Sequence, residues 1–204
     1  MSTCSATSHS PTATVEVDAK SVNTRHVILD RDGVLNREAP AQGYILTRAD
    51  FHWLPGTLEG LAMLHGAGLR LSVATNQSAV GRGLMDPAQL ADIMSHMRAE
   101  AAAAGGPIDA VFYCPHGPDE GCDCRKPKPG LLNDAVQASG IDPGHTLFVG
   151  DDLRDVDAAR AAGIAPVLLR TGKGAATELQ LRNRGFTLPI YDNLLQFARE
   201  LTDL

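Results

Sequence analysis

The sequence contains no long hydrophobic run and few aromatic residues. Aromatic side chains make up 4% of the 204 residues, and there is a single Trp. No apolar run approaches the roughly 20 residues that a membrane helix requires, and residues 1–25 lack the apolar centre of a secretory signal. These absences argue against a membrane protein and a secreted protein, so we expect a cytoplasmic one.

Positive charge is also scarce. The chain has 18 Lys and Arg against 24 Asp and Glu, which gives a formal net charge of -6 at pH 7. Nucleic-acid-binding proteins carry basic patches with interleaved aromatic residues, and the sequence has no such patch. We therefore expect no nucleic-acid partner. The hydrophobic content of 44% is enough for the sizeable core of one domain.

Cysteine is rare but clustered. Three of the four cysteines lie within residues 114–124, and in a reducing compartment such clustering indicates a metal site more than a disulfide. Cys4 lies in residues 1–24, which are rich in Ser, Thr and Ala and cannot bury enough apolar surface to order themselves. We expect a disordered tail over 1–24 and a single domain over 25–204.

From residue 26 onwards, short apolar segments alternate with segments of helical character. This alternation predicts an α/β fold with a doubly wound (Rossmann-like) parallel sheet and helices on both faces. In such sheets ligands bind beyond the carboxyl ends of the strands. Strands are predicted over 26–30, 70–74, 109–113, 146–150 and 165–169, and helices over 57–66, 87–104, 130–139, 153–162, 175–183 and 192–203.

Two acids stand at the end of the first predicted strand. The run Val27-Ile28-Leu29 is followed by Asp30, Arg31, Asp32 and Gly33. Carboxylates at the end of a core strand are costly to bury unless a cation or a reacting group compensates them. Asp30 is thus a candidate nucleophile and Asp32 a candidate acid and base. An Asp-Gly pair after a strand is also an ordinary turn, so this motif needs support from others.

Polar residues follow three further predicted strands. Each of these segments alone is typical of a loop or a helix start, but four in order at four strand ends favour one shared pocket. Carboxylates without histidine suit Mg²⁺, and hydroxyl, amide and lysine donors suit phosphoryl oxygens. The segments are Thr75-Asn76-Gln77-Ser78, Arg125-Lys126-Pro127 and Gly150-Asp151-Asp152 with Asp155.

This set of side chains predicts phosphoryl transfer onto an aspartate. Asp30 attacks phosphorus and forms an aspartyl-phosphate, while Asp32 protonates the leaving alkoxide and later deprotonates the attacking water. Mg²⁺, held by Asp30, Asp151 and the backbone carbonyl of Asp32, offsets the repulsion between carboxylate and phosphate. Thr75 and Lys126 bind the non-bridging oxygens.

A turn-rich segment before Arg125 offers four nitrogen and sulfur ligands. Three thiolates and one imidazole form a tetrahedral zinc set, and four protein ligands leave no open position, so the zinc is expected to be structural. Its expected role is to hold Arg125 and Lys126 over the phosphate. Free thiols on a mobile loop, or a Cys122–Cys124 disulfide, are the alternatives. The predicted ligands are Cys114, His116, Cys122 and Cys124.

These motifs resemble those of the haloacid dehalogenase superfamily of phosphatases, over residues 26–172. Within it, the segments 30–36, 75–78, 114–127 and 170–173 are similar to the D-glycero-D-manno-heptose 1,7-bisphosphate 7-phosphatase family. The resemblance implies removal of the C7 phosphate of a heptose bisphosphate, with Mg²⁺ and a structural zinc as cofactors. Its product would feed nucleotide-activated heptose and lipopolysaccharide synthesis.

The resemblance also assigns roles by position. Asp30, Asp32 and Asp151 would hold magnesium, and Arg125 would recognise the substrate. We further expect Arg125 to clamp a second anionic group, because a guanidinium binds phosphate bidentately. Asp152 stands where some members carry a lysine. The implied substrate-binding residues are Asn76, Gln77, Ser78, Arg125, Gly43, Tyr44 and Asp152.

The segments outside the core are too short for a large cap domain. About 25 residues separate Asp32 from the first helix, well below a domain's size. Histidinol-phosphate phosphatase resembles the chain in the same motifs and is the alternative, but Arg82 would repel its cationic substrate. A catalytically silent sugar-phosphate-binding or zinc scaffold protein is a further alternative, which the intact motifs disfavour. We expect a monomer acting on a small-molecule sugar phosphate.

Overall fold

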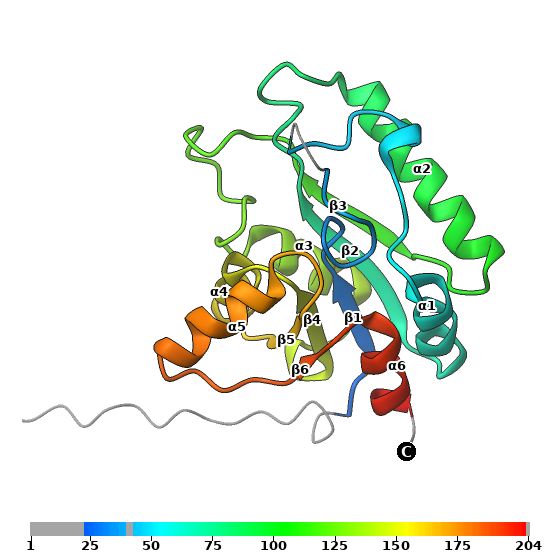
Figure 1. Cartoon of the computed structure of the whole chain (residues 1–204), viewed down its shortest axis with the longest axis vertical. Coiled ribbons are helices and arrows are strands. Elements are labelled where there is room, and N and C mark those ends of the chain that lie inside the picture. Colours follow the sequence, from blue (N-terminus) through cyan, green and yellow to red (C-terminus); the bar gives the residue numbers. More distant parts are fainter. Residues whose placement is uncertain (1–22, 40–42, 203–204) are drawn as a thin grey trace, which may run out of the picture.

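A computed structural model describes residues 23–39 and 43–202 of the chain. A six-stranded parallel sheet forms its centre, in the order β3-β2-β1-β4-β5-β6 (Figure 1). This confirms the predicted doubly wound sheet. The strands are β1 His26–Leu29, β2 Arg70–Asn76, β3 Ala110–Cys114, β4 Thr146–Gly150, β5 Ala165–Leu169 and β6 Ile190–Tyr191.

Helices cover both faces of the sheet, as predicted. Helices α1, α2 and α6 pack on one face, and α3, α4 and α5 pack on the other (Figure 1). The helices are α1 Thr57–Gly66, α2 Pro87–Ala103, α3 Gly130–Ser139, α4 Leu153–Ala161, α5 Gly174–Asn183 and α6 Leu194–Thr202, with short 3-10 turns at Arg48–Asp50 and Pro143–His145.

Strand β1 lies at the centre and is fully buried. Val27 and Leu29 pack into the core under α1, α2 and α6, and Ile28 packs into the core under α3 and α4. Leu29 is in register with Val73 of β2 and Val149 of β4. The residues that follow these three strands therefore meet at one edge of the sheet, which is where a parallel sheet places its ligands.

The structure departs from the predicted elements in small ways. β1 ends at Leu29, so Asp30 is the first residue beyond the strand, and β2 runs on to Asn76. β6 was not predicted because a two-residue strand carries almost no periodicity. The predicted tail over 1–24 lies outside the described residues except for its last two positions. Among the described residues, none of the helices is long and apolar enough to cross a membrane.

Candidate active site

A cavity of about 340 Å³ opens at the carboxyl edge of the sheet. Loops that follow β1, β2, β3, β4 and β5 contribute to its lining. The structure thus brings together every residue that the sequence assigned to catalysis and substrate binding. These are Asp30, Asp32, Gly43, Tyr44, Thr75, Asn76, Gln77, Ser78, Arg125, Lys126, Asp151 and Asp152.

Lys126 is buried beneath the cavity and holds two carboxylates. Its Nζ lies 3.0 Å from Asp30 Oδ2 and 2.7 Å from Asp155 Oδ1, and it donates to the carbonyl of Ala74 at 3.0 Å. Burial alone would lower the pKa of Lys126, but Asp155 and Asp30 outweigh it and raise the pKa above its ordinary value. The ammonium is therefore a fixed positive charge beside Asp30.

Three carboxylates crowd the same point, and one lysine does not neutralise them. Oxygens of Asp30, Asp151 and Asp155 all lie within 4.8 Å of one another. Burial raises the pKa of Asp30 to about 6, despite the attraction of Lys126. Burial and the neighbouring Asp30 and Asp155 raise the pKa of Asp151 to about 8. Such a cluster of hard oxygen ligands with uncompensated charge fits a divalent cation such as Mg²⁺.

Asp155 differs from the other two carboxylates in the number of contacts that it accepts. Oδ1 pairs with Lys126, and Oδ2 accepts from the backbone N–H groups of Asp151 and Asp152 at 3.2 and 3.0 Å. Asp155 thus fixes the start of α4 and orients Lys126. Asp155 accepts three contacts, whereas Asp30 accepts two, from the Arg31 N–H at 2.7 Å and from Lys126, and Asp151 accepts one, from the Lys173 N–H. Asp30 and Asp151 therefore keep more oxygen lone pairs for a cation than Asp155 does.

Two glycines hold the carboxylate of Asp151. A Cβ at Gly172 would lie 2.0 Å from Asp151 Oδ2, and one at Gly33 would lie 2.2 Å from it. Both glycines have positive φ, and the Lys173 N–H donates to the same oxygen at 2.8 Å. Asp151 therefore sits in a slot that any larger residue would close. The sequence motifs did not indicate this role, although they include Asp-Gly at 32–33 and Thr-Gly-Lys at 171–173.

Asp32 is oriented by a hydrogen-bond network. Arg31, whose side chain is fully buried, donates Nη2 to both Asp32 oxygens at 2.8 and 2.9 Å. Asn36 and Gln77 donate to Asp32 at 2.9 Å each. Burial alone would raise the pKa of Asp32, but Arg31 and these donors lower it below the ordinary range. The side chain thus points to its partners and is not part of the three-carboxylate cluster.

The end of β2 is tied to the segment that carries Lys126. Asn76 Nδ2 donates to the Lys126 carbonyl, and the Lys126 N–H donates to Asn76 Oδ1, both at 3.1 Å. Gln77 Nε2 donates to the buried Thr75 hydroxyl at 3.0 Å. These side chains position one another as well as lining the cavity.

Asp152 begins α4 and neutralises nearby cations. Its carboxylate accepts from the Arg154 N–H at 3.0 Å, pairs with the Arg154 guanidinium at 2.7 Å, and lies 3.6 Å from Lys173 Nζ. Burial alone would raise the pKa of Asp152, but the contacts with Arg154 outweigh burial and lower this pKa to about 2. Lys173 also pairs with Glu38 at 2.8 Å. Glu38, Arg154 and Lys173 line the cavity and were not in the predicted site.

The predicted zinc ligands also come together, in the segment between β3 and α3. Cys114 Sγ lies 3.6 Å from both His116 Nδ1 and Cys122 Sγ, and Cys124 Sγ lies 3.4 Å from His116 Nδ1. Tetrahedral bonds of about 2.0–2.3 Å to one zinc place such atoms roughly 3.6–3.8 Å apart, so the set fits the ion.

The cysteines of this cluster also fit a zinc site. All three cysteines are free thiols, so the Cys122–Cys124 disulfide is absent from this part of the structure. Burial raises the pKa of Cys114 to about 12, so a thiolate at this position needs a cation beside it. We call residues 114–124 the metal loop. It also holds Arg125, whose Nη1 donates to the His116 carbonyl at 3.2 Å.

Comparisons with known proteins agree with this geometry. A HAD-hydrolase-like family model matches residues 123–197. A Pseudomonas putida D-glycero-beta-D-manno-heptose-1,7-bisphosphate 7-phosphatase is 46% identical over 175 residues, covering 86% of this chain and 98% of the relative. The chain belongs to the heptose 1,7-bisphosphate 7-phosphatase family of HAD-like hydrolases.

Other heptose bisphosphate phosphatases match to a similar extent. The Pseudomonas aeruginosa member is 43% identical, over 86% of this chain and 96% of its own. A crystal structure of D,D-heptose 1,7-bisphosphate phosphatase from B. bronchiseptica, complexed with magnesium and phosphate, aligns with a TM-score of 0.81 at 40% identity. It covers 88% of this chain and 99% of the other. The match to the family therefore extends over 86–88% of this chain.

Proposed function

We propose that the protein is a Mg²⁺-dependent phosphatase that hydrolyses the C7 phosphate of D-glycero-D-manno-heptose 1,7-bisphosphate. The relatives carry the β anomer in their names, and we propose the same anomer for this chain. The observation that carries the proposal is the cluster of Asp30 and Asp151 beside the buried Lys126, at the floor of an open cavity.

Asp30 is the proposed nucleophile. Its oxygen lies beyond the last residue of β1, at the cavity floor, where the strand and Lys126 fix it. Attack on phosphorus forms an aspartyl-phosphate and expels the sugar C7 alkoxide. Lys126 and the Thr75 hydroxyl hold the non-bridging oxygens as charge shifts during transfer.

Asp30, Asp151 and the backbone carbonyl of Asp32 would hold Mg²⁺. The ion supplies the positive charge that lets a carboxylate approach a phosphate dianion. Gly33, Gly172 and the Lys173 N–H keep the Asp151 carboxylate in place for this contact.

Asp32 is the proposed acid and base. Its contacts with Arg31, Asn36 and Gln77 favour the ionised form, which suits removal of a proton from the water that attacks the aspartyl-phosphate. To protonate the leaving alkoxide in the first step, Asp32 has to carry a proton once substrate is bound. The substrate's own negative charge beside Asp32 favours that protonation.

The metal loop would position the side chains that select the substrate. With zinc bound to Cys114, His116, Cys122 and Cys124, the loop becomes rigid, and Arg125 is held through the His116 carbonyl. Gly43, Tyr44, Ser78 and Asp152 contribute further walls of the cavity. Asp152 would act there by neutralising Arg154 and Lys173.

We further propose that residues 25–204 form the phosphatase domain and that it works as a monomer in the cytoplasm. One chain supplies Asp30, Lys126 and Asp151 to the cavity, which is what a monomeric enzyme requires. A reducing compartment would keep the three metal-loop thiols available for zinc. Size-exclusion chromatography with light scattering measures the oligomeric state.

The direct test is phosphate release from two substrates. Purified protein with Mg²⁺ is given heptose 1,7-bisphosphate or histidinol phosphate, with and without EDTA. We expect kcat/KM for the bisphosphate to exceed that for histidinol phosphate by at least about 100-fold, because Arg82 and Arg125 repel an amine and attract an anion. EDTA should abolish release, and added Mg²⁺ should restore it.

Two outcomes contradict the proposal. Faster turnover of histidinol phosphate would assign the chain to that reaction instead. Binding of the bisphosphate without phosphate release would indicate a silent sugar-phosphate-binding protein.

A further inference from the structure

Resting on the proposed function, we propose that Arg82 is a substrate-binding residue that holds the phosphate that is not cleaved. It would do so together with Arg125, which the motifs already indicate. The reacting phosphate occupies the cavity floor at Asp30 and Lys126. A second phosphate on the same sugar therefore needs cationic side chains elsewhere on the cavity wall to bind it.

The pairing of the cationic side chains that line the cavity indicates Arg82 as a ligand for this phosphate. Six cationic side chains line the cavity, and four of them already pair with carboxylates. Within residues 23–39 and 43–202, Arg82 and Arg125 have no carboxylate partner. An anion therefore reaches these two without breaking an ion pair. The four existing pairings are Arg31 with Asp32, Lys126 with Asp30 and Asp155, Arg154 with Asp152, and Lys173 with Glu38 and Asp152.

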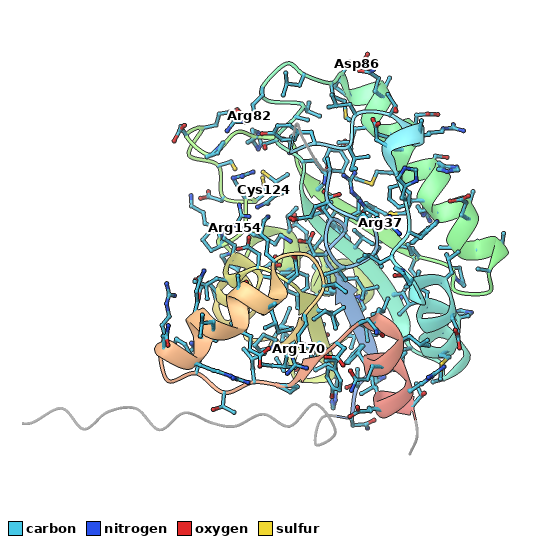
Figure 2. The ribbon with its side chains drawn as sticks, in the orientation of Figure 1. Arg37, Arg82, Asp86, Cys124, Arg154 and Arg170 are labelled. Atoms are coloured by element: carbon cyan, nitrogen blue, oxygen red, sulfur yellow. The ribbon has the colours of Figure 1, made fainter. Side chains whose placement is uncertain are left out.

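The turn that carries Arg82 is docked on the metal loop. The Gly81 N–H donates to the Pro115 carbonyl at 2.8 Å. A Cβ at Gly81 would lie 2.5 Å from Glu120 Oε1 and 2.8 Å from the Pro115 carbonyl, so only glycine permits this approach. Figure 2 labels Arg82 above Cys124, on the neighbouring loop. The metal loop thus fixes the backbone beside Arg82 as well as Arg125.

The two guanidiniums also keep most of their donors free. Arg125 uses one N–H on the His116 carbonyl, and in the described part of the chain the Arg82 side chain is exposed and donates to no protein acceptor. Each can therefore offer two parallel N–H donors to a phosphate, which is the geometry that guanidinium prefers. Arg82 would act on binding and selectivity, and Asp30 would still perform the chemistry.

The experiment compares Arg82→Gln with Arg154→Gln. Both variants remove one positive charge from the same cavity, but the Arg154 charge is already paired with Asp152. Steady-state kcat and KM are measured for heptose 1,7-bisphosphate and for heptose 7-phosphate, which lacks the second phosphate. Arg82→Lys serves as the conservative variant.

We expect Arg82→Gln to raise KM for the bisphosphate at least about tenfold, the size expected for lost charge-assisted hydrogen bonds, with kcat within about twofold. KM for the 7-phosphate should not change, and that unchanged turnover also shows that the variant is folded. Arg82→Lys should recover part of the loss, since it keeps the charge but not the bidentate geometry. Arg154→Gln should change KM for the bisphosphate less than about threefold, because its charge is already neutralised.

Three results would overturn the role of Arg82. In the first, Arg82→Gln raises KM equally for both substrates; in the second, it leaves KM for the bisphosphate unchanged. In the third, Arg82→Gln and Arg154→Gln raise KM for the bisphosphate equally. Normal wild-type turnover of the bisphosphate in those cases would leave the proposed function standing. A wild-type protein that does not hydrolyse the bisphosphate would refute the proposed function and this role together.

Discussion

The carboxylate cavity and the metal loop are both suited to metal ions, but they are built in opposite ways. Asp30 and Asp151 stand directly beyond the fully buried strands β1 and β4, so the core positions them whether or not a cation is bound. The metal loop has no helix or strand between Cys114 and Cys124. The fold creates the first site, whereas the ligands of the second create its local structure.

This difference predicts that changes in the cavity cost activity and spare the fold. The largest effect is expected for Asp30→Asn, which keeps the shape of the side chain but removes the nucleophilic oxygen. We expect kcat to fall by at least about 10³-fold, in line with losses of a covalent nucleophile. The rate of phosphate release from the heptose bisphosphate measures kcat. Tm, which reports on the fold, should stay within a few degrees of wild type.

Asp134→Asn is the matched control for Asp30→Asn. Asp134 is an exposed carboxylate on α3, away from the cavity lining. It should keep wild-type kcat. If Asp30→Asn retained turnover while this control behaved normally, Asp30 would not be the nucleophile.

The second effect concerns the glycine slot around Asp151. Gly172→Ala places a methyl group where Asp151 Oδ2 now lies, so the carboxylate has to move. We expect roughly 100-fold lower kcat/KM and weaker Mg²⁺ activation, because a misplacement of about 1 Å is this costly. A Mg²⁺ titration of activity is the measurement.

Gly163→Ala separates the steric effect from backbone strain. Gly163 has φ +71°, but a Cβ there meets nothing within 4 Å. This variant should lose about 1 kcal/mol of unfolding free energy with normal Mg²⁺ activation. Similar Mg²⁺ titration curves for both variants would show that the slot is not needed.

The third prediction concerns the metal loop. Cys122→Ser removes one ligand, and we expect zinc content to fall and the loop to lose protection in hydrogen exchange. The activity loss should be about tenfold and mainly in KM, because Arg125 loses its support while Asp30 and Lys126 remain on the core. A variant with wild-type exchange rates in residues 114–124 would contradict the structural role of the ion.

The smallest effect is a pH dependence of stability. A carboxyl group whose folded pKa is above its ordinary 3.8 binds more protons in the folded state, so it favours folding at low pH and destabilises as pH rises. With Asp30 at about 6 and Asp151 at about 8, Tm without Mg²⁺ should fall between about pH 4 and pH 8, most steeply below about pH 6, where both groups contribute.

Mg²⁺ and a neutral variant sharpen that measurement. Mg²⁺ should raise Tm most near pH 8, where it binds the ionised carboxylates. Asp151→Asn should flatten the slope, because its side chain does not titrate. If neither Mg²⁺ nor Asp151→Asn changed the slope of Tm against pH, the carboxylate cluster would not be the cause of the pH dependence.

Much of this molecule was readable from its sequence. The apolar strands and the predicted helix ranges depend on local patterns, and the structure places the start of α2 at residue 87 and α3 at residues 130–139, as predicted. The crevice rule then placed the residues after four strands in one cavity, because parallel strands end at the same edge.

What the sequence did not reveal depends on contacts between distant segments. The slot around Asp151 needs Gly33 and Gly172 to meet across 139 positions, and the Glu38–Lys173 pair spans a similar distance. The orientation of Asp32 by Arg31 and Gln77 likewise depends on how the chain turns after β1. A local sequence pattern does not determine which charged residues will pair when they are distant in the chain.

The central claim is that Asp30 accepts the phosphoryl group because a divalent cation compensates the carboxylate cluster. Acid quenching during turnover, followed by mass spectrometry of the peptide that contains Asp30, tests it most directly. We predict one added phosphoryl group on Asp30 when Mg²⁺ is present and none with EDTA. Phosphate release without any phosphoryl group on Asp30, at quench times shorter than one turnover, would contradict the account.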